Sequence, residues 1–377
     1  MELFDVYPLY DITPVKGKGV YIFDKEENKY LDLYGGHAVI SIGHSHPAYV
    51  NGISNQLKKL GFYSNSVKNP LQNKLAEKLE EVAGVKDYQL FLCNSGAEAN
   101  ENALKVASFH TGKDRVIYFE KAFHGRTSGV VAVTDNKNVQ APYNQNHKTT
   151  KLAFEDATGL EEELKKGDVA AVIFEVIQGV GGLDEASTKF YKKTSELSKE
   201  YGAMLIADEV QSGYGRTGDF FAFQKHGIRP DLISIAKGMG NGFPIGGVLI
   251  DKSIKAKPGM LGTTFGGNHL ACAAGIAVLD VIQRENLMQN ATELFDFLKS
   301  EALEIPQIKK VKGRGLMIGL EFDFEIAQLR KELLFKHQIF TGASANKKLL
   351  RILPPLTIQK EHFDTFFKAL KIALKQT

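Results

Sequence analysis

The 377-residue sequence is poor in cysteine and has no long apolar run. Its two cysteines, Cys93 and Cys272, can form at most one bridge, which excludes a disulfide framework and favours reduced thiols in a cytoplasm. No apolar run approaches the roughly 20 residues that a membrane-spanning helix needs. Residues 1–10 also lack the basic and then apolar pattern of a signal peptide. We therefore expect a cytoplasmic protein with no membrane partner.

Strong charge and compositional bias are also absent. The formal net charge of +3 is too small to indicate a nucleic-acid-binding surface. There are no repeats, low-complexity tracts or Pro/Ser-rich linkers, so domain boundaries have to be predicted from changes in pattern. What is present is an ordinary globular composition, with 43% hydrophobic and 24% charged residues. The length is sufficient for two domains, or for one large domain with a satellite.

Short apolar segments recur through the middle of the chain, separated by stretches with helical periodicity. This alternation predicts an α/β domain with a mainly parallel sheet covered on both faces. The expected strands are 88–93, 115–120, 170–177, 203–208, 231–236 and 246–250. From about residue 270 the pattern changes to a long helix, a strand or hairpin, and a terminal helix. We predict an N-terminal segment (1–45) that joins the smaller domain and lines the site, a large domain (46–265), and a smaller α+β domain (266–377).

Polar or glycine-rich motifs follow the carboxyl ends of five expected strands. They read NSGAEAN, KAFHGRT, QGVGG, DEVQSGYGRTG and KGMGNGFPIGG. Ligands of open α/β sheets bind outside these strand ends, so the five motifs predict one composite site.

The motif NSGAEAN predicts the start of a helix. Ser95, with Glu98 three residues later, forms a capping box. Gly96 and Ala97 leave the first turn free of bulk, so that its N–H groups and the helix dipole can face a phosphate. A plain capped helix is the alternative interpretation.

Two charged side chains follow apolar strand segments. Asp208 requires a cation or good hydrogen bonds there, from Arg216 or from a ligand such as the protonated ring nitrogen of pyridoxal phosphate. Lys237 is either a surface lysine or a partly desolvated amine that can form a Schiff base. The G-x-G-x-x-G spacing of a dinucleotide site is absent after it. Together with the anion anchor at Ser95 and a ring cover at Phe123, these residues supply the four parts that a pyridoxal phosphate enzyme needs.

At this point the sequence resembles a known family, the class III (ω-amino acid) pyridoxal phosphate aminotransferases of fold type I. Within that class it most resembles the acetylornithine and ornithine aminotransferases. The similarity runs nearly end to end and includes GHSHP, NSGAEANENALKVA, FHGRT, IADEVQSGYGRTG, AKGMGNGFPIGG, TTFGGNHLA and LRILPPLTI. It implies the fold type I architecture, pyridoxal 5'-phosphate as the cofactor, and a homodimer with shared active sites.

The resemblance also implies roles for single residues. Lys237 forms the Schiff base and moves the substrate proton, Asp208 pairs with the ring nitrogen, and Gln211 bonds the phenolic oxygen. Val210 packs beneath the ring and Phe123 stacks on its other face. The implied phosphate ligands are Ser95, Gly96, Ala97 and Thr264 of the partner subunit. No residue is assigned to a metal.

Two arginines are the expected carboxylate ligands, because a planar guanidinium binds a carboxylate in a bidentate way. By resemblance, Arg126 takes the carboxylate remote from the reacting amine, and Arg351 takes the α-carboxylate of glutamate. Isolated arginines are more often surface charges. His37 lies where ornithine-specific relatives have a substrate-contacting tyrosine. It either donates to a carboxylate or acyl group, or is a half-buried histidine satisfied by backbone.

The stretch EVIQGVGG departs from the pattern that it resembles. Relatives read EPIQGEGG, and the second glutamate covers the glutamate-binding arginine while an ω-amino substrate is bound. Here Val180 replaces that glutamate and Val176 replaces the proline. We expect Glu175 and Val180 to line the substrate side of the site. Valine cannot form the ion pair, so Arg351 is expected to be held by water, another acid or a substrate carboxylate.

The predicted function is transfer of the δ-amino group of N-acetylornithine or N-succinylornithine to 2-oxoglutarate in arginine biosynthesis. Ornithine or another ω-amino donor is the alternative, and related chains catalyse mutase or racemase chemistry. A nucleotide-binding oxidoreductase is disfavoured by the Asp208 and Lys237 pair and by the missing fingerprint. A regulatory module that only binds cofactor is disfavoured by the two arginines.

Overall fold

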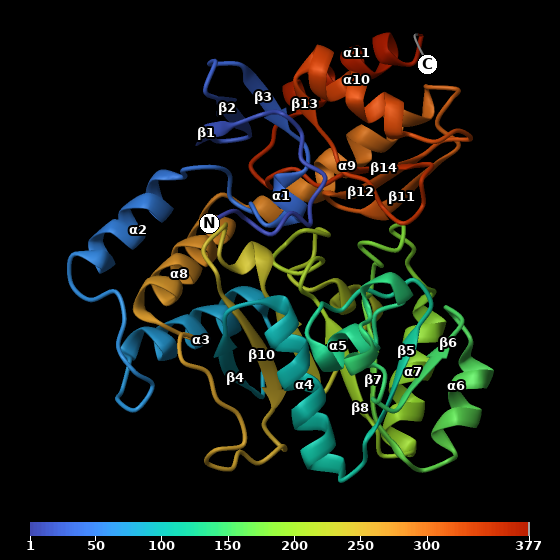
Figure 1. Cartoon of the computed structure of the whole chain (residues 1–377). Coiled ribbons are helices and arrows are strands. Elements are labelled where there is room, and N and C mark those ends of the chain that lie inside the picture. The colour runs from blue at the N-terminus through green and yellow to red at the C-terminus, as the bar shows by residue number, and fades with distance from the viewer. Residues whose placement is uncertain (376–377) are drawn as a thin grey trace.

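The computed structural model describes residues 1–375, which form two parts stacked one above the other (Figure 1). The lower part contains a seven-stranded sheet in the order β4-β10-β9-β8-β7-β5-β6. Its strands are β4 (Tyr88–Cys93), β5 (Arg115–Phe119), β6 (Thr149–Leu152), β7 (Val169–Phe174), β8 (Met204–Asp208), β9 (Leu232–Ile235) and β10 (Gly246–Asp251). Strands β9, β8, β7, β5 and β6 pair in parallel, and β10 pairs antiparallel with both neighbours. The predicted mainly parallel sheet is confirmed.

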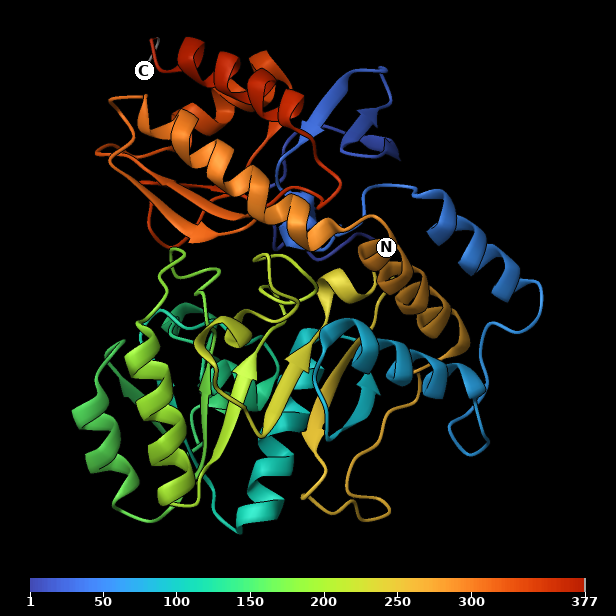
Figure 2. The same cartoon turned by 180° about the vertical axis from the view of Figure 1, so that it is seen from behind.

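Helices cover both faces of this sheet, as predicted. The helix α4 crosses one face, which is turned toward the viewer in Figure 1, and contacts β10, β9, β7 and β8. The helices α6 and α7 lie on the opposite face, in front in Figure 2. The helical elements of this part are α2 (Pro47–Leu57), α3 (Pro70–Ala83), α4 (Gly96–Thr111), α5 (Ser128–Ala132), α6 (Ala157–Leu164), α7 (Thr188–Glu200), η1 (Lys137–Val139), η2 (Pro142–Asn144), η3 (Ala222–His226) and η4 (Lys237–Met239).

The antiparallel strand β10 explains why its preceding loop belongs to the site. Parallel strands bring their carboxyl ends to one edge of the sheet, whereas a reversed strand begins at that edge. Gly246 pairs with Cys93 at the end of β4, so the segment from Lys237 to Gly246 stays at this edge. All five motifs therefore meet there.

The start of α4 follows the sequence prediction with one correction. Ser95 is the N-cap, and its Oγ accepts from Glu98 N at 3.1 Å. A capping box also requires the Glu98 side chain to accept from Ser95 N, and this part of the prediction is wrong. Glu98 Oε2 accepts from Asn94 N instead, at 3.0 Å. The helix ends at Gly112, whose φ of 69° suits glycine. Its alanine-rich stripe, which includes Ala99, Ala103 and Ala107, is buried against the sheet.

The upper part joins the two ends of the chain. Strands β1 (Pro14–Lys18), β2 (Tyr21–Asp24) and β3 (Lys29–Asp32) share a sheet with β13 (Ile339–Phe340). A second sheet contains β11 (Lys310–Arg314), β12 (Met317–Glu321) and β14 (Leu349–Ile352). The long helices of the upper part are α9 (Leu287–Leu303), α10 (Ala327–His337) and α11 (Lys360–Ala373). The N-terminal strands thus share a sheet with residues 339–340, while the division of the chain into domains stays a prediction.

The long helix α8 (His269–Arg284) lies at the junction of the two parts. It packs against α2 and α3 of the lower part and also contacts α9. The boundaries at 45/46 and 265/266 remain predictions. Within residues 1–375, no helix is long and apolar enough to cross a membrane. Cys93 and Cys272 are both buried free thiols.

Candidate cofactor and substrate site

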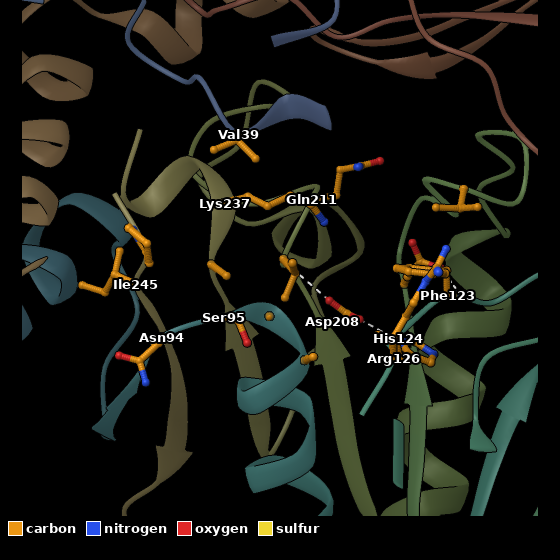
Figure 3. A pocket seen from close by; sticks show the side chains of 18 of the residues that line it. Val39, Asn94, Ser95, Phe123, His124, Arg126, Asp208, Gln211, Lys237 and Ile245 are labelled. Atoms are coloured by element: carbon orange, nitrogen blue, oxygen red, sulfur yellow. Dashed lines mark hydrogen bonds and ion pairs between the residues drawn. The ribbon is translucent and has the colours of Figure 1, made fainter. Parts of the chain in front are cut away.

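The five motifs enclose a cavity of about 410 Å³ at the carboxyl edge of the sheet (Figure 3). Most residues predicted for the site line it: Ser95, Gly96, Ala97, Phe123, Arg126, Glu175, Val180, Asp208, Val210, Gln211 and Lys237. The other three predicted residues, His37, Arg351 and Thr264, do not line this cavity. Asn94, Val39 and the segment 242–245 also line it and were not predicted.

Asp208 is buried at the end of β8 and is held by side chains from two other elements. Its Oδ2 lies 2.7 Å from His124 Nδ1 (Figure 3) and also accepts from Asn100 Nδ2 at 2.7 Å. Its Oδ1 accepts from Val210 N at 3.0 Å. These bonds fix the carboxylate at the floor of the cavity.

The structure rejects Arg216 as the partner of Asp208. Its guanidinium is buried and donates to the carbonyl oxygens of Leu316 and Pro354, so it ties the DEVQSGYGRTG loop to the upper part. Burial lowers the pKa of Arg216 to about 9. The second possibility, a ligand cation at Asp208, therefore stays open.

Lys237 follows β9 and lines the same cavity as Asp208. Its φ of 46° lies in the left-handed region, which costs an L-residue about 1–2 kcal/mol and is typical of functional sites. Burial lowers the pKa of the Lys237 amine, and the nearby Arg351 charge acts in the same direction. The carboxylates of Asp208 and Glu175 oppose that shift. The surface-lysine alternative is wrong for this residue.

Glu175 joins two of the motif loops. One carboxylate oxygen accepts from Phe123 N at 3.0 Å, and the other accepts from Gly179 N at 2.9 Å. Burial raises the pKa of Glu175, and the neighbouring Asp208 charge adds to that effect. Both oxygens are thus already engaged with backbone, although the side chain lines the cavity.

The start of α4 and the DEVQ loop fit closely together. A Cβ at Gly96 would lie 2.6 Å from Val210 Cγ1, so no larger residue fits beneath Val210. Gly96 and Ala97 belong to the first helical turn, whose N–H groups have no intrahelical acceptor. Gln211 Oε1 is buried with no hydrogen-bond partner among the described residues. The cavity thus offers an anion-binding helix end and an unpaired amide oxygen.

Arg126 and Thr264 are exposed. No carboxylate within residues 1–375 is within ion-pair distance of Arg126, which lines the cavity. Thr264 follows Thr263, whose Oγ1 accepts from Asn94 Nδ2 at 3.3 Å. A contribution of Thr264 to a partner's site stays a prediction.

Arg351 and His37 lie beside the cavity. Arg351 is buried on β14, and its Nη1 donates to Gly179 O at 2.8 Å. His37 is exposed, and its Nδ1 pairs with the Tyr34 hydroxyl, so a half-buried histidine satisfied by backbone is wrong. Although the residue as a whole is exposed, partial desolvation of the imidazole lowers the pKa of His37, and the charges of Arg351 and Lys237 add to this effect.

Sequence reasoning missed the two side chains that hold Asp208. Asn100 is a buried polar residue on the otherwise alanine-rich stripe of α4, and this was the available signal. His124 stands inside the quoted FHG motif, but only the phenylalanine was assigned. Contacts between β8, α4 and the loop after β5 cannot be obtained from spacing along the chain.

The geometry fits pyridoxal phosphate. The helix N-terminus at Gly96 offers N–H groups to a phosphate, and Asp208 offers a buried carboxylate to a ring cation. The Gln211 Oε1 atom is unpaired and can therefore bond to a polar group of a ligand. Lys237 supplies an amine whose pKa is lowered. Val210 and Phe123 are apolar groups that border the same cavity. These are the donors, charges and surfaces that the cofactor requires.

Comparisons with known proteins agree with this site. The family described as "Aminotransferase class-III" matches residues 6–374. The acetylornithine aminotransferase of Bacillus subtilis (strain 168) is 39% identical over 382 residues, covering 99% of this chain and 97% of that protein. That of Archaeoglobus fulgidus is 38% identical, with 99% and 97% covered.

Solved structures show the same fold. Ornithine aminotransferase from Toxoplasma gondii matches with a TM-score of 0.91 and 28% identity, covering 98% of this chain and 93% of that one. Acetylornithine aminotransferase from Elizabethkingia anophelis matches with a TM-score of 0.85 and 30% identity, covering 98% and 96%. The fold and the site define a pyridoxal phosphate enzyme of fold type I. The chain belongs to the class III aminotransferases, and its cofactor is pyridoxal 5'-phosphate.

Proposed function

We propose that this enzyme transfers the δ-amino group of N-acetylornithine or N-succinylornithine to 2-oxoglutarate, giving an N-acylglutamate semialdehyde and glutamate in arginine biosynthesis. The observation that carries this proposal is the full-length similarity, at 36–40% identity, to curated relatives named acetylornithine aminotransferase. Ornithine is the second candidate donor, because the structural neighbours include ornithine aminotransferases with a TM-score up to 0.91.

The cofactor would be held by residues that already line the cavity. Ser95, Gly96 and Ala97 would bind the phosphate at the start of α4, and Lys237 would hold the cofactor covalently. Asp208 would pair with the ring nitrogen while His124 and Asn100 fix its carboxylate. The remaining ring contacts would come from Phe123, Val210 and Gln211.

When bound, pyridoxal phosphate supplies an electron sink that allows the substrate carbon to lose a proton. Lys237 would move that proton, because a general base is most effective when its pKa lies near the working pH. Burial of its amine acts in this direction. Asp208 would keep a proton on the ring nitrogen, because its buried carboxylate is stabilised by a neighbouring cation. The walls formed by Val210, Phe123 and Val180 would limit the access of water.

Two arginines would select the substrates. Arg126, which is exposed and without an ion-pair partner in the described part of the chain, would bind the carboxylate remote from the reacting amine. Arg351, which is buried beside Gly179, would bind the α-carboxylate of glutamate and 2-oxoglutarate. His37 would contact a carboxylate or acyl group, and Glu175 would hold the loops that border the substrate.

We also propose a homodimer with shared sites in the cytoplasm. Phe62 and Phe265 are exposed, and their rings lie 5.5 Å apart. Tyr63 and Leu60 extend this apolar surface next to Thr264, and large apolar patches mark interfaces. Light scattering checks the dimer. Thr264→Val should weaken phosphate binding, and unchanged cofactor affinity would contradict the shared site. The two free thiols favour the cytoplasm.

Half-reactions test the donor. Purified holoenzyme is mixed separately with N-acetylornithine, N-succinylornithine, ornithine and 4-aminobutyrate, and the cofactor absorbance is followed over time. We expect an N-acylornithine to react fastest at equal concentration, and 2-oxoglutarate to restore the starting spectrum. A faster reaction with ornithine would favour the second candidate. No spectral response to any of the four would overturn the proposal.

A further inference from the structure

Arg351 has no acidic partner among residues 1–375. Its side chain is 4% exposed, and its Nη1 donates to a backbone carbonyl, Gly179 O. Its Nε is buried without a partner, and no carboxylate within residues 1–375 lies within ion-pair distance. Glu175 is the acid whose charge reaches Arg351, but both of its oxygens are bonded to backbone N–H groups. Val180, on the same loop, cannot supply a charge.

The ring of Tyr34 lies beside the Arg351 guanidinium, where relatives are expected to place a glutamate. The Arg351 guanidinium carbon lies 6.0 Å from the centre of the Tyr34 ring, within the range of a cation–π contact. The ring fits against Gly342, where a Cβ would lie 2.6 Å from Tyr34 Cε2. Gly342 pairs with Arg351 through reciprocal backbone bonds. A glycine at 342 thus makes the space that brings the ring to the arginine.

The backbone around Tyr34 is held in an unusual conformation. The turn α1 (Gly35–Ala38) has φ between 54° and 67° at all four residues, including the non-glycine His37 and Ala38. Asp32 Oδ1 accepts from Tyr34 N at 3.0 Å and from Gly35 N at 2.8 Å, which anchors the start of the turn. Strain of this kind persists where the surroundings enforce it, often at functional sites.

The same turn connects Tyr34 to the reaction centre. His37 Nδ1 pairs with the Tyr34 hydroxyl, and His37 O accepts from Gln211 Nε2 at 3.4 Å. Desolvation of the imidazole and the charges of Arg351 and Lys237 lower the pKa of His37, which favours the neutral ring. A neutral ring carrying its proton on Nδ1 donates to the Tyr34 oxygen, which leaves the Tyr34 O–H free to donate elsewhere.

We infer that Tyr34 is a specificity-determining residue that replaces the acid expected at position 180. Its ring covers Arg351 without neutralising it, and its hydroxyl, oriented by His37, is a second donor to the carboxylate that Arg351 binds. The inference rests on the proposed role of Arg351 in the glutamate half-reaction. A carboxylate then enters without first breaking an ion pair inside the protein.

Calorimetric titration of the holoenzyme with glutarate tests this arrangement without turnover. Glutarate has the two carboxylates of 2-oxoglutarate but no reactive carbonyl. We expect Tyr34→Phe to weaken binding roughly ten-fold, the effect of losing one hydrogen bond to a charged group. Tyr143→Phe, at an exposed tyrosine, is the matched control. Equal affinities of these two variants would overturn the inference.

Further variants separate the possible failures. Arg351→Gln should abolish measurable glutarate binding. Wild-type affinity in that variant would refute the proposed role of Arg351 itself, whereas its loss together with unaltered binding by Tyr34→Phe would refute only the Tyr34 inference. Val180→Glu should weaken binding more than Val180→Gln, which matches it in size but has no charge. Equal effects would contradict a charge on Arg351 that no acid of the protein neutralises.

A double-mutant cycle tests the link to His37. His37→Asn keeps a residue that tolerates positive φ but removes the imidazole. If His37 acts through Tyr34, then the double variant with Tyr34→Phe binds glutarate no more weakly than Tyr34→Phe alone. Additive losses would contradict this link.

In steady state, Tyr34→Phe should raise KM for 2-oxoglutarate with little change in kcat, because the hydroxyl acts in binding. A fall in kcat at unchanged KM would contradict this role.

Discussion

Asp208 Oδ2 and His124 Nδ1 lie 2.7 Å apart in the floor of the cavity, and both side chains are buried. This contact connects the strand β8 to the loop after β5 and helps to fix the carboxylate in place. We expect Asp208→Asn to reduce turnover by about 10²–10³-fold, the usual cost of removing one charge-stabilising group from a reaction centre. Steady-state rates and circular dichroism measure this effect. Asp364→Asn, on α11, is the control, and a comparable loss in it would contradict a local cause.

Replacement of Lys237 should stop the reaction while leaving cofactor binding measurable. Lys237→Ala removes the amine that moves the proton, which alone accounts for about 10²–10⁴-fold in rate. Lys252→Ala, at an exposed lysine that pairs with Asp87, should keep full activity. Fluorescence titration with cofactor checks that the Lys237 variant still binds. Measurable full activity of Lys237→Ala would refute the assignment.

Gly96 is expected to tolerate no side chain. Gly96→Ala places a Cβ 2.6 Å from Val210 Cγ1, and relieving this overlap displaces either the first turn of α4 or the valine. Cofactor affinity should fall about ten-fold or more, because overpacking of this kind costs about 1–3 kcal/mol. Gly262→Ala is the matched control, because a Cβ there meets open space. Equilibrium titration of the apoenzyme compares the two variants, and equal affinities would argue against the close fit.

The pH dependence of cofactor attachment should report the Lys237 amine. Because its pKa is lowered, the neutral amine becomes available at a lower pH than in a free lysine. The rate of cofactor attachment to the apoenzyme should rise with pH, with a midpoint below 10.5. Glu175→Gln should move the midpoint further down, because the Glu175 charge raises the pKa of Lys237. Glu120→Gln, at an exposed residue, should leave it in place. A midpoint that rises in Glu175→Gln would contradict the sign of this coupling.

Both cysteines should be inert in the folded enzyme. Burial raises the pKa of the Cys93 and Cys272 thiols to about 12, and only the thiolate reacts. A thiol reagent at pH 8 should therefore react at least about 100-fold more slowly with native protein than with protein in denaturant. Absorbance of the released chromophore measures both rates. Rapid labelling of the native form would show that one thiol is accessible.

Most of the sheet could be predicted because its strands are continuous apolar runs. The strand β6 was not predicted, because its sequence, TTKL, is mostly polar. Such a sequence is tolerated because β6 is an edge strand and is only partly buried. The expected strand over 170–177 was too long at its end. It stops at Phe174 because the chain then turns, with Gln178 N donating to Asp184 O. Local pattern indicates apolarity, but it does not show where a loop turns back.

The cavity residues that belong to the five sequence motifs could be predicted. Residues within motifs were brought together because all of them follow strand ends at one edge. The contacts of Asp208 with Asn100 and His124 could not be predicted, because they depend on how α4 and two loops pack. The same holds for Tyr34, which approaches Arg351 only through pairing between the two ends of the chain.

The parallel pairing of β3 with β13 sets an order on how the chain folds during synthesis. Leu31 pairs with Ile339, so the upper sheet stays incomplete until more than 300 further residues have left the ribosome. The seven-stranded sheet needs nothing beyond Asp251 and can form earlier. The nascent protein can thus form the strand ends next to Asp208 and Lys237 before it can place Arg351 beside Tyr34.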